Sequence, residues 1–152
     1  MAAIKFGTSG WRGLIARDFT FDNVRLATQG IAEYLLKPSG QANGEPVARS
    51  KSVILGYDTR FLGREFSLAA AEVLAANGLE PVICQRDAPT PVIAHTIRLR
   101  KAAGGINMTA SHNPAEYQGL KFSTSNGAPA QPEVTREIEE RRDGFAFFIA
   151  QN

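Results

Sequence analysis

The chain has little cysteine, little net charge and no long apolar segment. Its single cysteine in 152 residues, Cys84, cannot form a disulfide within the chain. The apolar run that ends at Cys84 predicts a buried strand cysteine rather than a reactive thiol, which is compatible with a reducing, cytoplasmic location. No apolar stretch approaches the roughly 20 residues of a transmembrane helix, and no signal-peptide pattern is present, so we expect no membrane partner.

The net charge is small because the charges of both signs are interspersed. The formal value of +2 comes from 17 basic and 15 acidic residues. Proteins that bind nucleic acid usually carry a clustered basic face, and no such cluster occurs here, so we expect no nucleic-acid partner. The densest charged run, Arg136 to Asp143, mixes both signs and predicts a solvent-exposed helix face. The length is that of one ordinary globular domain.

Short apolar segments alternate with segments of helical periodicity. This alternation predicts an α/β fold, a three-layer α/β/α sandwich with a mixed, mainly parallel sheet. The segment 37–52, rich in glycine, proline and polar residues, predicts a mobile loop. Strands are expected at 53–57, 80–84, 105–109 and 119–123, and helices from Thr20 or Asp22 to about 35, from 64 to 77, from 90 to about 101 and from 132 to about 142.

The most informative segment is Thr109-Ala110-Ser111-His112-Asn113-Pro114. It places a hydroxyl beside an imidazole in a loop that follows an expected strand. A serine becomes a good nucleophile only when a base, a positive field or a metal assists it. In α/β sheets, ligands bind at the carboxyl ends of strands, where this loop is expected to lie. An ordinary polar turn could have the same residues, since a short motif alone is weak evidence.

Two further segments carry phosphate-binding chemistry. Residues 6–13 contain three glycines, the hydroxyls of Thr8 and Ser9, and the guanidinium of Arg12. Glycine lets the backbone approach a ligand closely, and arginine binds oxyanions through two nitrogens, so this loop is a candidate phosphate site. Asp58 and Arg60 end another apolar run, and we interpret them as an ion pair or loop brace rather than a catalytic pair.

These segments, with 117–122 after the serine loop, occur in an order that resembles the N-terminal domain of the α-D-phosphohexomutases, the phosphoglucomutase/phosphomannomutase family. The resemblance covers about residues 4–142. It implies that Ser111 carries a phosphoryl group that it exchanges with hexose phosphate and hexose bisphosphate. It also implies that Arg12 faces the phosphoserine, that Lys121 assists proton transfer, and that His112 is an acid/base or orienting group. Thr8 and Ser9 would shape the loop and contact phosphate.

The resemblance further implies Mg²⁺, bound partly through the phosphate on Ser111 and partly by an aspartate-rich loop of another domain. The sequence contains no Asp-Gly-Asp-x-Asp segment and no Gly-Glu-x-Ser-Gly sugar loop. We therefore interpret residues 1–144 as the phosphoserine domain of a larger isomerase and residues 145–152 as an apolar tail or the start of a linker to a missing domain. We expect the chain alone to be inactive, and its exposed domain interface could allow self-association.

Two other functions are compatible with the sequence. The chain could be a free-standing domain that binds phosphosugars or regulates a full-length mutase by docking on it. It could also be an α/β phosphatase-like enzyme with Ser111 as its nucleophile, although no acidic metal cluster accompanies that serine. Two residues are interpreted as structural: His95, within an expected helix, and Cys84. The sequence leaves open which hexose phosphate is the substrate.

Overall fold

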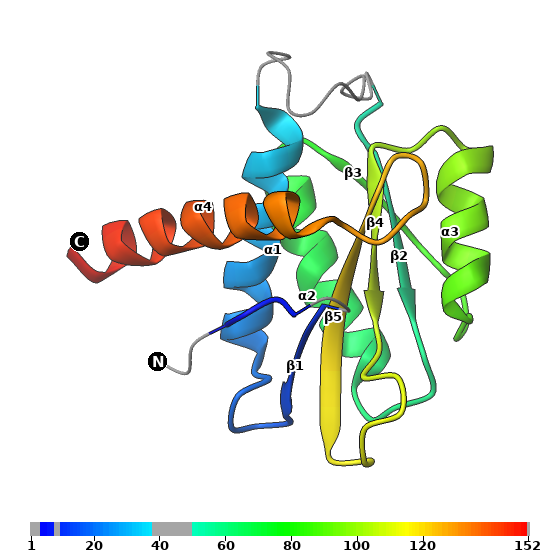
Figure 1. Ribbon diagram of the computed structural model, residues 1–152, viewed down its shortest axis with the longest axis horizontal. Helices are drawn as coiled ribbons and strands as arrows, with labels where there is room; N and C mark the ends of the chain where they lie inside the picture. Colours follow the sequence, from blue (N-terminus) through cyan, green and yellow to red (C-terminus); the bar gives the residue numbers. More distant parts are fainter. Residues whose placement is uncertain (1–3, 8–9, 38–49, 152) are drawn as a thin grey trace.

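The computed structural model describes residues 4–7, 10–37 and 50–151, with side chains described up to residue 144. Strands and helices alternate along most of the chain, and Figure 1 shows their arrangement. In chain order they are β1 (Trp11–Leu14), α1 (Phe21–Leu36), β2 (Ser52–Tyr57), α2 (Gly63–Ala76), β3 (Glu80–Ile83), α3 (Thr90–Leu99), β4 (Gly104–Met108), β5 (Tyr117–Thr124) and α4 (Pro132–Gln151).

The sheet has the strand order β1-β5-β4-β2-β3. Strand β2 pairs in parallel with both β3 and β4, whereas β5 pairs antiparallel with both β4 and β1. Only β5 therefore runs against the other strands of the sheet, which confirms the expected mixed, mainly parallel arrangement. The short edge strand β1 was not predicted.

Helices cover both faces of the sheet, as a three-layer sandwich requires. Figure 1 shows α1, α2 and α4 on one side and α3 on the other. Side chains of β2 alternate between the two layers, because successive residues of a strand point to opposite faces. Val53 and Leu55 join the larger core with α1 and α2, and Ile54 joins the smaller core with Ile93 and Ile97 of α3.

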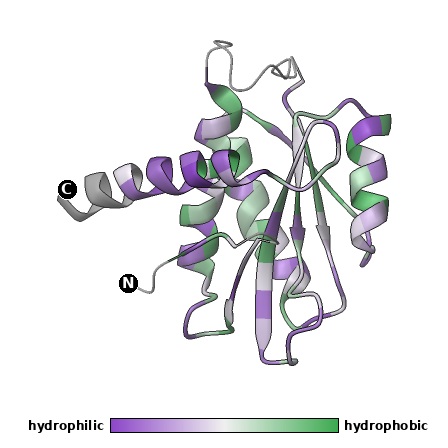
Figure 2. Ribbon diagram, in the orientation of Figure 1, coloured by the Kyte–Doolittle hydropathy of each residue, from purple (hydrophilic) through white to green (hydrophobic). Residues whose placement is uncertain are grey.

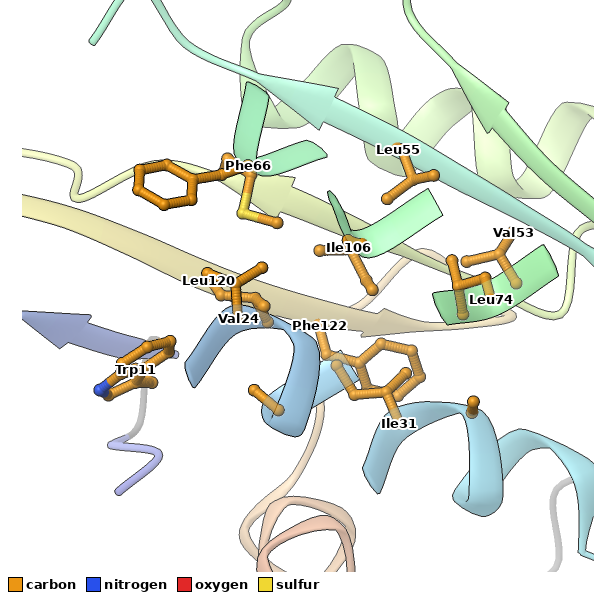
Figure 3. Packing of buried hydrophobic residues seen from close by; sticks show 14 of the residues in the cluster. Trp11, Val24, Ile31, Val53, Leu55, Phe66, Leu74, Ile106, Leu120 and Phe122 are labelled. Atoms are coloured by element: carbon orange, nitrogen blue, oxygen red, sulfur yellow. The ribbon is translucent and has the colours of Figure 1, made fainter. Parts of the chain in front are cut away.

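The larger core is built on aromatic and branched side chains (Figure 3). Phe19 is fully buried, stacks on Trp11 with ring centroids 4.4 Å apart, and meets Phe66 edge to face at 4.9 Å. These contacts join the segment after β1 to α2. They therefore fix the position of β1, which carries one of the candidate site residues.

Helix ends follow local sequence signals, with one difference. The Thr20 hydroxyl accepts a hydrogen bond from the Asn23 backbone N–H at 3.2 Å and caps α1, as expected. Gly78 follows α2 with a φ of +77°, a conformation that favours glycine. A threonine followed by proline, as in Thr90-Pro91, is a typical helix start with the threonine as N-cap. In α3, however, Pro89 is the N-cap residue, and the Thr90 hydroxyl accepts a hydrogen bond from Asn107 of β4 instead.

The interpretation of residues 136–143 as a solvent-exposed face is wrong in part. Figure 2 shows that this part of α4 is largely hydrophilic, yet Ile138 is fully buried in the larger core. The Lys37 ammonium lies 2.7 Å from Glu137, and a Cβ on Gly30 of α1 would lie only 2.6 Å from the Ile138 carbonyl oxygen. The charged run therefore packs tightly across α1.

Helix α4 also continues beyond the expected end near residue 142, to Gln151. Residues 145–151 are thus helical, and Figure 1 shows this end projecting away from the sheet. Their assignment as a tail or linker stays a prediction. Most of the loop expected at 37–52 lies outside the described residues. Within the described part of the chain, no helix is both long and apolar enough to cross a membrane.

Candidate functional site

The serine loop, residues 109–116, connects β4 to β5 at the carboxyl edge of the parallel strands. Its base is fixed on both sides by backbone hydrogen bonds. The Thr109 N–H donates to the Gly119 carbonyl at 2.8 Å, and the Asp58 N–H, just after β2, donates to the Met108 carbonyl at 3.0 Å. Three strands therefore meet at this loop: the ends of β2 and β4 and the start of β5. The sequence predicted this position for the ends of β2 and β4.

Ser111 is exposed and has a left-handed backbone conformation, with a φ of +57°. Its N–H donates to the Thr109 hydroxyl at 3.0 Å, and the Asn113 N–H donates to the Ala110 carbonyl at 3.1 Å. A residue other than glycine in this region is strained, and such residues cluster at functional sites. The tight turn presents the Ser111 side chain to solvent.

Arg12 reaches the serine loop from β1. Its Nη1 donates to the Asn113 side-chain oxygen at 2.8 Å, across 101 residues of sequence separation. Within the described residues this is the only hydrogen bond of the guanidinium, so its other N–H groups can bind a ligand. Thr8 and Ser9, the other residues expected in the glycine-rich loop, lie outside the described residues.

Lys121 lies on β5, opposite Asn107 of β4, and is half-buried. Burial lowers the pKa of its ammonium group, the nearby Arg12 lowers it further, and Asp58 acts in the opposite direction. An amine with a lowered pKa releases its proton more easily and is better suited to acid/base work near neutral pH. The Lys121 stem passes under Gly10, where a Cβ would lie 2.9 Å from Lys121 Cγ.

A cavity of about 90 Å³ adjoins Lys121. It is also lined by Asn107 and Thr90 and by the backbone near Gly10. The Asn107 Oδ1 atom is buried and has no hydrogen-bond partner, while its Nδ2 donates to the Thr90 hydroxyl at 2.9 Å. The cavity lies between β5 and the start of α3, and Lys121 is the candidate site residue that lines it.

Exposure differs among three further residues from the sequence analysis: His112, His95 and Cys84. His112 is exposed next to Ser111 and makes no hydrogen bond or ion pair within the described residues. His95 is exposed on α3, so it does not pack in the core. Burial raises the pKa of the half-buried Cys84 thiol, which disfavours the reactive thiolate.

Arg60 braces the serine loop, in agreement with its interpretation from the sequence as a loop brace. Its Nη2 donates to the carbonyl oxygens of Ser111 and Asn113 at 3.0 and 2.5 Å. Its Nη1 donates to those of Pro114 and Tyr117 at 2.7 and 3.0 Å. No sequence pattern pointed to these partners, nor to Asn113 as the partner of Arg12, because Asn113 followed by proline is typical of a simple turn.

The described residues do not form a metal site by themselves. They contain no group of three or more histidine, cysteine, aspartate or glutamate side chains placed to hold a metal ion. Magnesium prefers several oxygen ligands, many of them carboxylates. The donor set that this part of the chain offers therefore does not fit Mg²⁺ unless further ligands come from elsewhere.

Fold and site together define a three-layer α/β domain that presents an exposed serine loop, flanked by an arginine and a lysine, at the carboxyl edge of its sheet. The sequence matches the family described as phosphoglucomutase/phosphomannomutase, alpha/beta/alpha domain I, over residues 3–145. The chain belongs to this family.

Several relatives illustrate the match. A phosphoglucomutase from Staphylococcus saprophyticus is 34% identical over 140 residues, which cover 90% of this chain and 24% of the relative. A phosphoglucosamine mutase from Shewanella sediminis is 37% identical, covering 91% of this chain and 29% of the relative. A solved structure from Thermus thermophilus, described as a proposed phosphomannomutase, is 40% identical with a TM-score of 0.81, covering 91% of this chain and 30% of that one.

The chain thus spans only about a quarter to three tenths of the length of these relatives. What it matches is their domain I.

Proposed function

We propose that the chain acts as the phosphoserine domain of a phosphohexomutase, an isomerase that moves a phosphoryl group between two positions of a hexose. Ser111 is the residue that carries the phosphoryl group. The observation that supports this proposal most directly is the exposed, left-handed Ser111 in a braced loop, with Arg12 and Lys121 on the neighbouring strands. The family membership of the chain supports it as well.

The charge of the site suits a phosphorylated serine. A phosphoserine carries roughly −1.5 to −2 charges near neutral pH and needs positive partners. Arg12 approaches the loop through Asn113 and retains N–H groups that can bind the phosphate. Thr8 and Ser9, in the same glycine-rich segment, are proposed to add hydroxyl or backbone contacts to phosphate.

Two transfers complete the reaction. In the first, the bond between Ser111 Oγ and phosphorus breaks while phosphorus bonds to a sugar hydroxyl oxygen. The hydroxyl proton passes to Lys121 or His112 and ends on Ser111 Oγ. In the second, the bond between phosphorus and the other phosphorylated sugar oxygen breaks while phosphorus bonds to Ser111 Oγ. The Ser111 hydroxyl proton passes to the sugar oxygen that has lost its phosphoryl group. The lowered pKa of Lys121 supports its part in these proton transfers.

The remaining partners follow from the same proposal. Mg²⁺ would take the phosphate on Ser111 as one ligand and its other ligands from a different domain, where it would neutralise phosphoryl charge. The chain would act with the remaining mutase domains on hexose phosphate and hexose bisphosphate, with no nucleic acid or membrane as partner. We propose a cytoplasmic location, and self-association through the domain interface when the other domains are absent.

The test joins this chain to the part of the Thermus thermophilus relative that it does not cover, in place of the corresponding domain. We call this protein the chimera. We expect it to interconvert the 1- and 6-phosphates of glucose or mannose when primed with hexose bisphosphate, and the chain alone to show no turnover. Ser111→Ala should abolish activity. The control Ser125→Ala, in the turn at the far end of β5 from the serine loop, should retain it.

Two outcomes would count against the proposal. Turnover by the Ser111→Ala chimera would exclude Ser111 as the phosphoryl carrier, and a folded but inactive wild-type chimera would argue against the mutase function. Tight calorimetric binding of hexose phosphate by the chain alone would instead favour a free-standing phosphosugar-binding domain.

A further inference from the structure

Arg60 holds the serine loop through its backbone. One guanidinium donates to four carbonyl oxygens of a segment that lies more than 50 residues further along the chain. Backbone carbonyls need hydrogen-bond donors, and those of a loop have no regular ladder to supply them. The bonds to Asn113 and Tyr117 are part-buried, and those to Ser111 and Pro114 are exposed. Arg60 is the donor that replaces the ladder here, and one of its acceptors is the carbonyl of Ser111 itself.

Arg60 is itself held firmly in place. Its Nε lies 3.4 Å from Asp58 Oδ2, and its backbone N–H donates to Asp58 Oδ1 at 3.0 Å. The Asp58 N–H in turn donates to the carbonyl of Met108 at the end of β4. Only 15% of the Arg60 side chain is exposed. The guanidinium is therefore a rigid extension of the sheet rather than a mobile surface group.

The carbonyl contacts bear directly on the conformation of Ser111. Arg60 binds the carbonyl on one side of the Ser111 residue, while the Thr109 hydroxyl accepts from the N–H on the other. Both ends of the residue are thereby fixed, and its left-handed φ of +57° is maintained against its intrinsic cost. Asp58 offsets the positive charge of Arg60, and the four carbonyl oxygens occupy the N–H donors of its guanidinium. Arg60 therefore has little charge and few N–H donors left to bind a phosphate.

We propose that Arg60 is a positioning residue for phosphoryl transfer, which fixes the Ser111 hydroxyl by clamping the carbonyls of its loop. This inference rests on the proposed function of Ser111. Arg60 acts through geometry, in contrast to Arg12, which we place against the phosphate. A lysine cannot replace it, because an ammonium group lacks the planar fork that reaches four acceptors at once. A charge-conserving substitution should therefore fail at position 60.

The first arm of the test uses the chain itself and does not depend on activity. Nuclear magnetic resonance should show that Arg60→Lys changes the φ-dependent coupling constant of Ser111 and speeds hydrogen exchange at the Asn113 and Tyr117 amides. Amides of β2 and β4 should keep their protection. The control is Arg64→Lys, an exposed arginine on α2. An unchanged loop in Arg60→Lys would overturn the proposal.

The second arm uses the chimera. Misplacing reacting groups by about 1 Å can cost about 10²-fold in rate. We expect Arg60→Lys to lower kcat by about 10- to 100-fold with KM nearly unchanged, and the pH profile to keep its shape. A kcat within about twofold of wild type, or a loss confined to KM, would overturn the positioning role.

A second variant covers the case in which Arg60→Lys does not fold. Asp58→Asn keeps the shape of the anchoring side chain but removes its charge, and should produce a smaller loosening of the same loop amides. No loosening would contradict the clamp. If the wild-type chimera never phosphorylates Ser111, the proposed function fails, whereas the resonance measurements still decide whether Arg60 holds the loop.

Discussion

Ser111 combines a chemical role with a backbone conformation that glycine would adopt more easily. We therefore predict that Ser111→Gly makes the chain more stable while removing the phosphoryl acceptor. Ser111→Ala removes the same hydroxyl but keeps a Cβ, so it should bring no gain. The pair of variants separates the strain at this position from its chemistry.

The magnitude follows from the φ of +57° at Ser111. The left-handed conformation costs a residue with a Cβ roughly 1–2 kcal/mol. Glycine removes that cost but loses about 0.5–1 kcal/mol of conformational entropy on folding. With central values of about 1.5 and about 0.75 kcal/mol, the net gain is about 0.75 kcal/mol. At this chain length each kcal/mol shifts Tm by about 2–4 °C, so Ser111→Gly should raise Tm by about 1.5–3 °C.

The assay is thermal and urea unfolding of the chain, with the same variants tested for turnover in the chimera. Ala16→Gly is the matched control, because Ala16 is exposed and has a φ of +66° in the turn after β1. It should gain about as much stability without loss of activity. If Ala16→Gly is stabilising but Ser111→Gly is neutral or destabilising, Ser111 does not have the strained backbone described here.

Three further predictions concern the lysine and the sheet. Arg12→Gln should raise the pKa of Lys121, and Asp58→Asn should lower it. Nuclear magnetic resonance titration of the lysine side chain measures both shifts, and shifts of the opposite sign would contradict the described electrostatics. Because the folded-state pKa of Lys121 lies below its unfolded value, the free energy of unfolding should rise with pH between the two pKa values. Lys121→Met should remove this rise and increase Tm near neutral pH. An unchanged pH dependence of stability in urea unfolding of Lys121→Met would contradict this prediction. Gly119→Ala should cost about 1–3 kcal/mol in chemical denaturation, since its Cβ would lie 2.5 Å from the Thr109 carbonyl oxygen, and a neutral result would show that the loop base is not packed so closely.

The elements that could be predicted are those whose sequence pattern is local. Near-continuous apolar runs identified β2 and β4, because strands covered on both faces need apolar residues on both. Strand β1 escaped detection because it has only four residues, two of them Arg12 and Gly13, and no clear alternation. The charged run of α4 looked solvent-exposed because only the packing of Gly30 against Ile138 reveals that this helix lies tightly on α1.

The candidate site divides in the same way. Ser111 and Arg12 could be proposed from short motifs and Lys121 from the family resemblance, and the structure brings Arg12 to the serine loop and its charge near Lys121. The four carbonyl partners of Arg60 and the bond from Arg12 to Asn113 could not be proposed. They join segments 51 to 101 residues apart, and depend on strand order and register that no local pattern specifies.

The central claim is that Ser111 carries the phosphoryl group, and phosphopeptide mass spectrometry of the chimera tests it most directly. After incubation with hexose bisphosphate and removal of free sugar, we predict one phosphate per chain, on Ser111, and its loss when hexose phosphate is added. The unaltered Thermus thermophilus protein serves as the reference for complete labelling. An unphosphorylated Ser111 in a chimera that turns over, or a phosphate on another residue of this chain, would contradict the account.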